Sequence, residues 1–248
     1  MRIVDIFRYP IKGLGHERLD EVDLAVGSAL PGDRATAVSH GASAFDPAAP
    51  SWQPRRNFQV VANTPAYAAV TLARVDGNVR LSHPEVASVE VDLASDAGRA
   101  ALADWMGALP GARPGPWHVA QLEGQAMTDM EPPYVSIHTH ASLRALSEHL
   151  GVPPAPHRFR GNIWIEDAPP WAEEDWLGQE ITLGTVRLNV VEPIGRCMAP
   201  SASPQTGARD VEVTKQLHAY RGRPNFGVYA EVIAGGTVAV GDAVEAPE

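Results

Sequence analysis

The stretch Thr185–Cys197, TVRLNVVEPIGRC, contains an alternating, β-branched run followed by a turn that holds the only cysteine of the chain. Runs of about four to eight residues with this pattern are typical of strands, so we expect a strand over Thr185–Val191. Gly195 and Arg196 stand directly before Cys197. A thiol in a turn at the end of a strand can be reached by a ligand, and a neighbouring guanidinium favours the thiolate form.

Similar short runs recur along the chain, separated by turn residues, and this spacing is typical of a barrel or a sandwich. They lie at Arg2–Tyr9, Arg34–Ser39, Phe58–Ala62, Ala69–Val75, Val79–Ser82, Ser88–Val91, Tyr134–Thr139, Asn162–Ile165 and Phe226–Ile233. Helical periodicity is rarer and is confined to Asp96–Met106, Ala141–Leu150 and Val213–Tyr220. The sequence therefore predicts a mainly β chain with a few helices, of the α+β class.

Two segments rich in Gly, Pro and Ala suggest how the chain is divided. Gly107–Pro116, GALPGARPGP, is interpreted as the join between two halves, residues 1–116 and 117–248. Gly41–Pro54 is expected to be a long exposed or lid-like loop, and loops of this length in a compact domain are often functional.

Composition limits the classes of partner. The chain has 248 residues, with 20 basic against 30 acidic side chains and a formal net charge of −10, which argues against binding nucleic acid. No apolar run is long enough to span a membrane, and the first residues alternate like a strand instead of forming a signal peptide. A single cysteine cannot form an internal disulfide, so we expect a cytoplasmic protein without membrane partners.

Four basic residues occupy turns that contain glycine, namely Lys12, Arg34, Arg160 and Arg196. Guanidinium groups and backbone amides are the natural partners of phosphate, and glycine lets a ligand approach the backbone closely. We expect Lys12, Arg34, Arg160 and Cys197 to line one cleft between the two halves. The alternative is that these are ordinary surface cations. The common nucleotide, hydrolase and dithiol motifs are absent from the sequence.

Other interpretations of the chemistry remain open. A lone cysteine is often simply a small buried hydrophobic residue. If Cys197 binds a metal, a soft or high-valent ion suits a thiolate better than magnesium or calcium. His138 and His140 would point the same way on a strand and could share a zinc ion, although no third ligand is evident. A nucleophilic pair of Cys197 with a histidine has no supporting local motif.

Several segments, taken in order, resemble the MOSC family, named for the C-terminal domain of molybdenum-cofactor sulfurases. The N-terminal half resembles the β-rich domain that precedes MOSC in many members, on Tyr9–Gly13 and Leu30–Arg34. The C-terminal half resembles MOSC itself on Ala141–Leu143, Arg158–Asn162, Gly195–Cys197, Pro204–Gly207 and Gly235–Asp242.

This resemblance implies a MOSC-type β-barrel preceded by a smaller β-rich domain, and a site for the molybdenum–pterin cofactor. It implies that Cys197 ligates molybdenum or carries sulfur, while Lys12, Arg34, Arg160 and Asn162 hold the pterin and its phosphate. With Arg196 beside the thiol, these are the candidate site residues. Members related to the mitochondrial amidoxime-reducing component reduce N-hydroxylated compounds with electrons from partner proteins.

The sequence departs from the family pattern at four positions. Gly13 stands where a small hydroxyl residue is usual and Gly161 where proline is usual, while Pro200 and Ser203 replace threonine and aspartate. The chain ends without a cysteine-bearing iron–sulfur segment and contains no desulfurase segment, so electrons or sulfur are expected from a separate donor protein.

The leading hypothesis is a molybdenum-cofactor-dependent oxidoreductase acting on small N–O substrates. The first alternative is a non-redox carrier of sulfur or cofactor that uses a Cys197 persulfide. A binding or detoxification protein without the cofactor, and a zinc enzyme built on His138 and His140, are the remaining alternatives.

Overall fold

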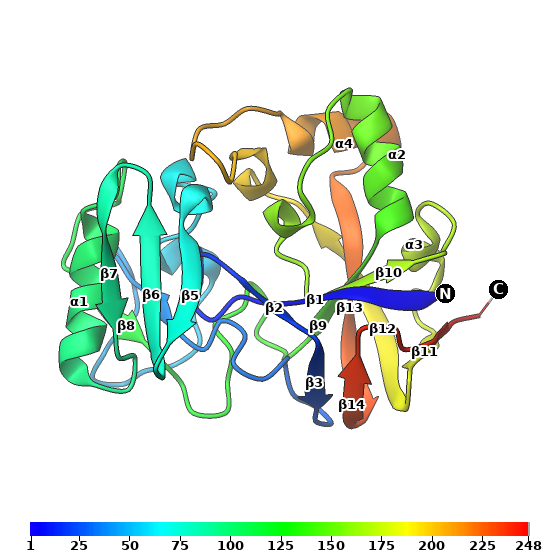
Figure 1. The fold of residues 1–248 in the computed structure, drawn as a ribbon, viewed down its shortest axis with the longest axis horizontal. Coiled ribbons are helices and arrows are strands. Elements are labelled where there is room, and N and C mark those ends of the chain that lie inside the picture. Colours follow the sequence, from blue (N-terminus) through cyan, green and yellow to red (C-terminus); the bar gives the residue numbers. More distant parts are fainter. Residues whose placement is uncertain (248) are drawn as a thin grey trace.

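The computed structural model describes residues 1–247 and shows a mainly β protein with four α-helices among those residues. Figure 1 shows a large lobe built on the main sheet and a smaller lobe beside it. Across the main sheet the strands run in the order β15 (Val244–Glu245), β11 (Glu180–Leu183), β12 (Val186–Gly195), β13 (Asn225–Ala234), β9 (Val135–Thr139), β10 (Ile163–Glu166), β1 (Arg2–Arg8) and β2 (Glu17–Leu19). The predicted α+β class is confirmed.

The main sheet mixes two strand directions. β9 runs parallel to β10, and the other paired strands are antiparallel. Its strand ladders end at β15 and β2, so the expected closed barrel is not seen in residues 1–247. A single bridge between Arg2 and Ala243 brings β1 towards the segment that precedes β15. The first strand of the chain thus lies within the large lobe, and the division at residue 116 stays a prediction.

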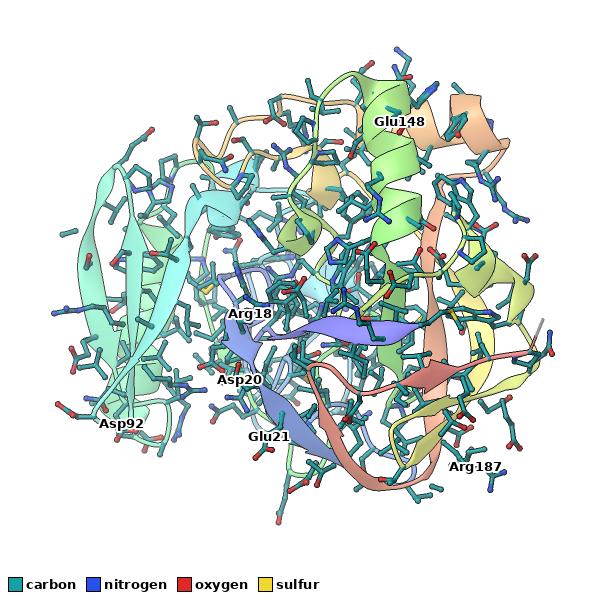
Figure 2. The ribbon with its side chains drawn as sticks, turned by 45° about the vertical axis from the view of Figure 1, so that its right-hand side comes forward. Arg18, Asp20, Glu21, Asp92, Glu148 and Arg187 are labelled. Atoms are coloured by element: carbon teal, nitrogen blue, oxygen red, sulfur yellow. The ribbon has the colours of Figure 1, made fainter. Side chains whose placement is uncertain are left out.

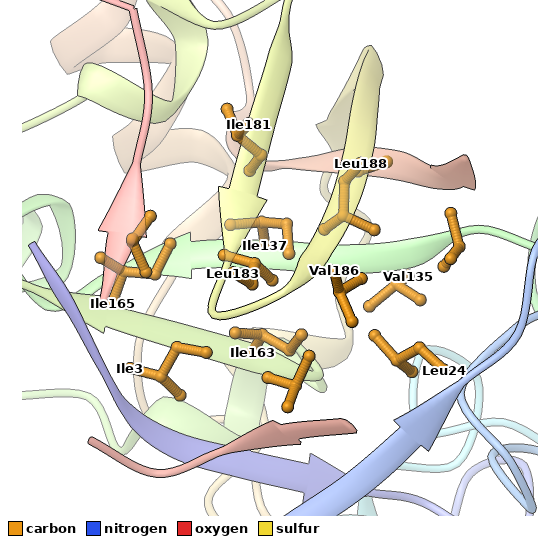
Figure 3. Close-up of a cluster of buried hydrophobic side chains, with 14 of the residues drawn as sticks. Ile3, Leu24, Val135, Ile137, Ile163, Ile165, Ile181, Leu183, Val186 and Leu188 are labelled. Atoms are coloured by element: carbon orange, nitrogen blue, oxygen red, sulfur yellow. The ribbon is translucent and has the colours of Figure 1, made fainter. Parts of the chain in front are cut away.

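Strand β9 is buried on both faces because it lies in the middle of the sheet. Val135 and Ile137 point into the largest apolar core, where Ile163 of β10 and Leu188 of β12 also lie (Figure 3). Ser136 and His138 take the other face, and both are buried. Polar side chains here need partners inside the protein, because water cannot reach them.

The smaller lobe is a three-stranded meander covered by a helix. β5 (Thr71–Val75), β6 (Asn78–His83) and β7 (Val86–Val91) precede α1 (Asp96–Gly107). Ser95 caps this helix, since its hydroxyl accepts a hydrogen bond from the amide of Gly98 at 3.0 Å. Leu102, Trp105 and Met106 are buried against the meander, and the helix lies where the sequence predicted one, over Asp96–Met106.

Two short ladders connect distant parts of the chain. β3 (Glu21–Leu24) pairs with β14 (Gly236–Ala239), and β4 (Ala37–Val38) pairs with β8 (Val119–Ala120). The main sheet also carries helices α2 (His140–Leu150), α3 (Ala172–Asp175) and α4 (Val213–Arg221). α2 and α4 pack through a second apolar cluster that includes Leu143, Leu146 and Leu217. Gly151 ends α2 with a φ of 70°, as expected for a left-handed cap.

Three sequence-based expectations are corrected. Phe58–Ala62 is not a strand, since only Phe58 forms an isolated bridge, to Ser39, and the chain turns before Pro65. The strand expected at Arg34–Ser39 shrinks to Ala37–Val38, because Arg34 adopts a left-handed backbone. His138 and His140 do not share a strand face, because β9 ends at Thr139, whose side chain caps α2.

Charged side chains lie mainly on the outside, as Figure 2 shows for Asp92, Glu148 and Arg187. Within residues 1–247, no helix has both the length and the apolar character required to cross a membrane.

Glu173 of α3 is a carboxylic acid that is buried against the start of α2. Glu173 has no exposed surface, and its Oε2 accepts hydrogen bonds from Thr139 Oγ1 at 2.9 Å and Ser142 Oγ at 2.8 Å. Its Oε1 has no partner. Burial raises the pKa of Glu173 to about 7, although the two hydroxyl donors act in the opposite direction.

We expect a Glu173→Gln variant to be more stable than the wild type at pH 8, by on the order of 1–2 kcal/mol. The folded state holds this proton more tightly than the unfolded state, so stability falls as pH rises from about 4.5 to about 7. The difference should vanish below pH 5. Urea unfolding of both proteins across this range measures it, and a constant difference at all pH values would contradict the expectation.

Candidate functional site

A cavity of about 460 Å³ is lined by residues from both parts of the chain. This volume lies in the usual range of small-molecule sites. The structure brings all six candidate residues to it, namely Lys12, Arg34, Arg160, Asn162, Arg196 and Cys197. Arg160 and Asn162 come just before β10, and Arg196 and Cys197 come just after β12, on either side of the β9–β13 pair.

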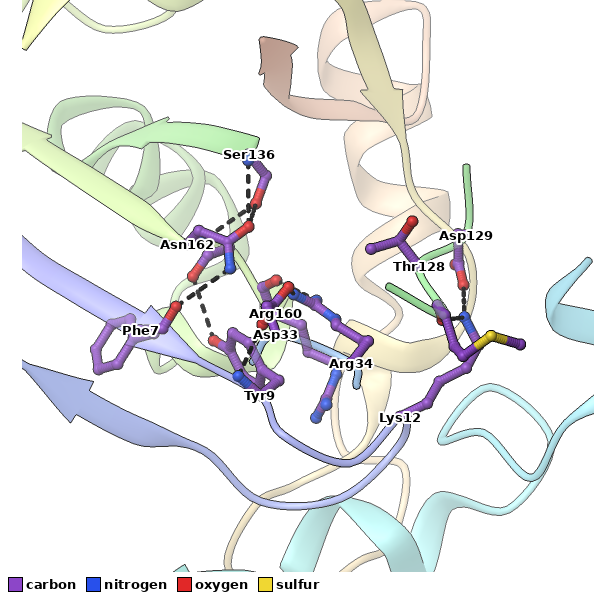
Figure 4. Close-up of polar contacts among 12 residues, drawn as sticks. Phe7, Tyr9, Lys12, Asp33, Arg34, Thr128, Asp129, Ser136, Arg160 and Asn162 are labelled. Atoms are coloured by element: carbon purple, nitrogen blue, oxygen red, sulfur yellow. Dashed lines mark hydrogen bonds and ion pairs between the residues drawn. The ribbon is translucent and has the colours of Figure 1, made fainter. Parts of the chain in front are cut away.

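Lys12 is held in place by acceptors of the opposite wall. Its Nζ donates to the carbonyl of Met127 at 2.8 Å and to Asp129 Oδ1 at 2.5 Å (Figure 4). Only 4% of the residue is exposed, and this burial lowers the pKa of Lys12 while Asp129 opposes the shift. Lys12 therefore enters the cavity with its charge already largely balanced.

Arg34 and Arg160 share one platform, the buried ring of Tyr9. The guanidinium carbons lie 4.6 Å and 4.4 Å from the ring centroid, within the range of cation–π contacts. Arg34 pairs with Asp33 and donates to the carbonyl of Arg160 at 2.6 Å (Figure 4). Both arginines have a left-handed backbone, with φ of 46° and 53°. Such conformations cost about 1–2 kcal/mol in residues other than glycine and cluster at functional sites.

Arg196 and Cys197 are fixed from both sides of the turn after β12. The Arg196 guanidinium donates to the carbonyls of Phe226 and Phe159, the latter at 2.8 Å. The carbonyl of Cys197 accepts a hydrogen bond from Thr214 Oγ1 of α4 at 2.7 Å. Cys197 is half-buried, so its thiol lies at a cavity wall and not in a sealed core.

Carboxylates pair with some cations of the cavity, such as Lys12 and Arg34, but not with all of those that residues 1–247 contribute. Among residues 1–247, Arg160 and Arg196 form no ion pair with a carboxylate, and their hydrogen bonds go to backbone carbonyls and, for Arg196, to His138. Burial, together with the nearby charge of Arg34, lowers the pKa of each to about 10. Both groups are nevertheless charged at pH 7. A half-buried cation without a carboxylate favours an anionic ligand, which would supply the missing partner.

Asn162 differs from the cationic residues, because its side-chain amide forms hydrogen bonds with other residues of the protein. Oδ1 accepts from the amide and the hydroxyl of Ser136, and Nδ2 donates to the carbonyl of Phe7 at 3.2 Å. The side chain ties β9, β10 and β1 together beneath the cavity (Figure 4). One amide hydrogen is left over for a ligand.

Several cavity residues were not predicted. Tyr9 lay within a motif that the sequence did mark, yet only the fold places its ring under two arginines. No sequence pattern marked Asp129 as a site residue, because its local sequence does not indicate that it forms an ion pair with Lys12. Arg158 also lines the cavity, but it is paired with Asp210 through two contacts of 2.6 Å.

The zinc alternative finds no support in the geometry. His138 is fully buried, while His140 stands at the start of α2 and contacts Asp5 at 2.9 Å. Across residues 1–247, no group of three or more His, Cys, Asp or Glu side chains is arranged to hold a metal ion.

The fold and the site thus define a β-rich protein with a cationic cavity and a thiol at its wall. Residues 130–245 match the family model of the MOSC domain. Molybdenum cofactor sulfurase of Homo sapiens is 38% identical over 73 residues, which cover 29% of this chain and 8% of that protein.

Mitochondrial amidoxime-reducing component 1 of Xenopus laevis is 28% identical over 131 residues, covering 48% of this chain and 37% of that protein. The chain therefore spans only a small part of the sulfurase and about a third of the amidoxime-reducing component. Among solved structures, the YUAD protein from Bacillus subtilis aligns with a TM-score of 0.45 and 12% identity, covering 98% of this chain and 93% of that one.

Proposed function

We propose that this protein binds the molybdenum cofactor in the cavity and reduces small N-hydroxylated or other N–O substrates. The observation that carries the proposal is a pair of half-buried guanidinium groups beside the thiol of Cys197, those of Arg160 and Arg196, which form no ion pair with a carboxylate among residues 1–247. The similarity to a cofactor sulfurase and an amidoxime-reducing component points to the same cofactor.

The residues present fit this cofactor by their chemistry. Arg160 and Arg196 would bind its anionic phosphate, with Arg34 holding the Arg160 turn and Lys12 adding a single charge from the opposite wall. The soft thiolate of Cys197 suits molybdenum. When bound, the metal would supply two-electron redox chemistry at the cavity wall.

The proposed substrate reaction takes two electrons and two protons for each N–O bond and releases the oxygen as water. The electrons would come from a separate donor protein. The cavity is large enough for a ligand and open enough for Cys197 to remain half-buried. The same accessibility favours the alternative, in which a sulfur-donor protein loads Cys197 with persulfide for transfer to the cofactor, without redox chemistry at the metal.

The first test is metal and pterin analysis of protein purified from a host that makes the cofactor. We expect about one molybdenum and one pterin for each chain. Protein that carries sulfane sulfur on Cys197 without metal would favour the carrier. Protein with neither, after purification under the same conditions as a known molybdenum enzyme, would contradict the proposal.

A Cys197→Ser variant separates the two functions. If the thiol ligates molybdenum, the variant should retain pterin, change the absorption spectrum of the metal and lose reductase activity. If the thiol only carries sulfur, persulfide transfer should be lost while the spectrum of bound metal stays as in the wild type. Cofactor content should change little in either case, because Arg160 and Arg196 remain.

A further inference from the structure

His138 lies beneath the cavity and does not line it. Its imidazole has no exposed surface and is stacked between two aromatic side chains, with ring centroids 4.8 Å from Trp164 and 5.6 Å from Phe226. Its Nε2 accepts a hydrogen bond from Nη2 of Arg196 at 3.3 Å. Nε2 of His138 is therefore the atom through which this aromatic layer forms a hydrogen bond with Arg196.

Two glycines make room for this ring. A Cβ atom at position 161 would lie 1.8 Å from Cδ2 of His138, and one at position 227 would lie 2.0 Å from its Nδ1. Real side-chain contacts do not approach so closely, so neither position can hold another residue while His138 keeps its place. Gly161 is one of the four positions at which the sequence departs from the family pattern, and the imidazole gives this departure a physical reason.

The hydrogen bond also determines the tautomer of His138. A guanidinium group can only donate, so Nε2 must be unprotonated and the proton must reside on Nδ1. Nδ1 has no hydrogen-bond partner, which is costly for a buried polar atom. Burial and the charge of Arg196 lower the pKa of His138 well below its ordinary value, so the ring is neutral.

If the side chain at position 138 only filled space between the aromatic rings, histidine would be energetically unfavourable there. Leucine or phenylalanine would fill this apolar space without an unsatisfied nitrogen and its desolvation cost. The one contact that histidine makes and an apolar side chain cannot make is the one to Arg196. We propose that His138 is a positioning residue, whose neutral imidazole acts through Nε2 to hold the Arg196 guanidinium in place for an anionic ligand beside Cys197. The ligand part of this inference rests on the proposed function.

Calorimetric titration with inorganic phosphate tests the positioning role. His138→Leu and His138→Phe both remove the acceptor, and we expect either to weaken phosphate binding about 3- to 10-fold. His138→Gln, whose amide oxygen can take the place of Nε2, should stay within about twofold of the wild type. In an Arg196→Ala background, His138→Leu should cause no further loss, because the interaction it removes is already gone.

Full phosphate affinity in both apolar variants, or an undiminished loss in the Arg196→Ala background, would overturn the proposal. A second measurement does not depend on any ligand. Nitrogen NMR of protein with labelled histidine, assigned by the signal missing from His138→Gln, should show a neutral ring protonated on Nδ1. A ring protonated on Nε2 would also overturn it. Failure of the wild type to bind phosphate, with the Nδ1 tautomer observed, would count against the proposed function and not against the role of His138.

Discussion

Replacing Arg160 with alanine should weaken retention of the anionic cofactor by about 10- to 100-fold. Charge-assisted hydrogen bonds contribute about 1.5–3 kcal/mol each, and every 1.4 kcal/mol changes affinity tenfold. Arg160 is a half-buried cation of the cavity that forms no ion pair with a carboxylate of residues 1–247. Because the net charge of the chain is −10, the mean field of the protein opposes an anion, and binding depends on such local groups.

Arg160 gives a cleaner test than Arg34 or Lys12. Removing Arg34 would leave the buried carboxylate of Asp33 without its ion-pair partner, and removing Lys12 would leave the exposed Asp129 with only its longer contact to Arg55, at 3.7 Å. Both variants would mix a loss of stability with a loss of affinity. An Arg160→Gly variant is the companion, because glycine accepts the left-handed backbone at this position.

Cofactor content after desalting, together with the melting temperature, measures the effect. The matched control is Arg144→Ala, since this arginine is 58% exposed and pairs with Glu166 on the surface of the large lobe. We expect no change in retention for the control. Equal retention in the Arg160 and Arg144 variants would show that the cationic turns do not form the binding site.

Replacing Gly227 with alanine should destabilise the protein by about 3 kcal/mol or more. Two costs combine at this position. The backbone has a φ of 78°, which costs about 1–2 kcal/mol for a residue with a side chain. The added Cβ would also collide with the ring of His138 and lie 2.8 Å from the carbonyl oxygen of Ile137, and overpacking of this kind costs about 1–3 kcal/mol.

Gly161→Ala separates these two costs, because no left-handed angle is found at Gly161. In a His138→Ala background, which removes the ring, Gly161→Ala should become nearly neutral while Gly227→Ala remains destabilising. Chemical denaturation of the three single and two double variants measures the coupling. If His138→Ala does not relieve Gly161→Ala, the glycine is required for another reason and the ring does not dictate it.

The mainly β character and three of the helices could be predicted from local pattern. Thr185–Val191 alternates because one face of β12 is buried, and Ala141–Leu150 has a stripe because α2 packs on α4. Phe58–Ala62 misled the prediction, since an apolar run next to a turn can be buried without joining a strand ladder. Short strands such as β2 and β11 were missed for the converse reason, because distant partners stabilise them more than their own composition does.

For the site, the amino-acid sequence by itself indicated the candidate residues that the fold brings to one cavity: one thiol, and cations in turns that allow a close backbone approach. It could not determine which of those cations keep a free charge. Lys12 and Arg34 form ion pairs with carboxylates. Within residues 1–247, the side chains of Arg160 and Arg196 form hydrogen bonds to carbonyl groups and, for Arg196, to an imidazole, but no ion pair with a carboxylate. Those partners lie far away in the chain, at Asp129 for Lys12 and His138 for Arg196. Electrostatic balance depends on distance in space and on exclusion of water, and only the tertiary structure decides both.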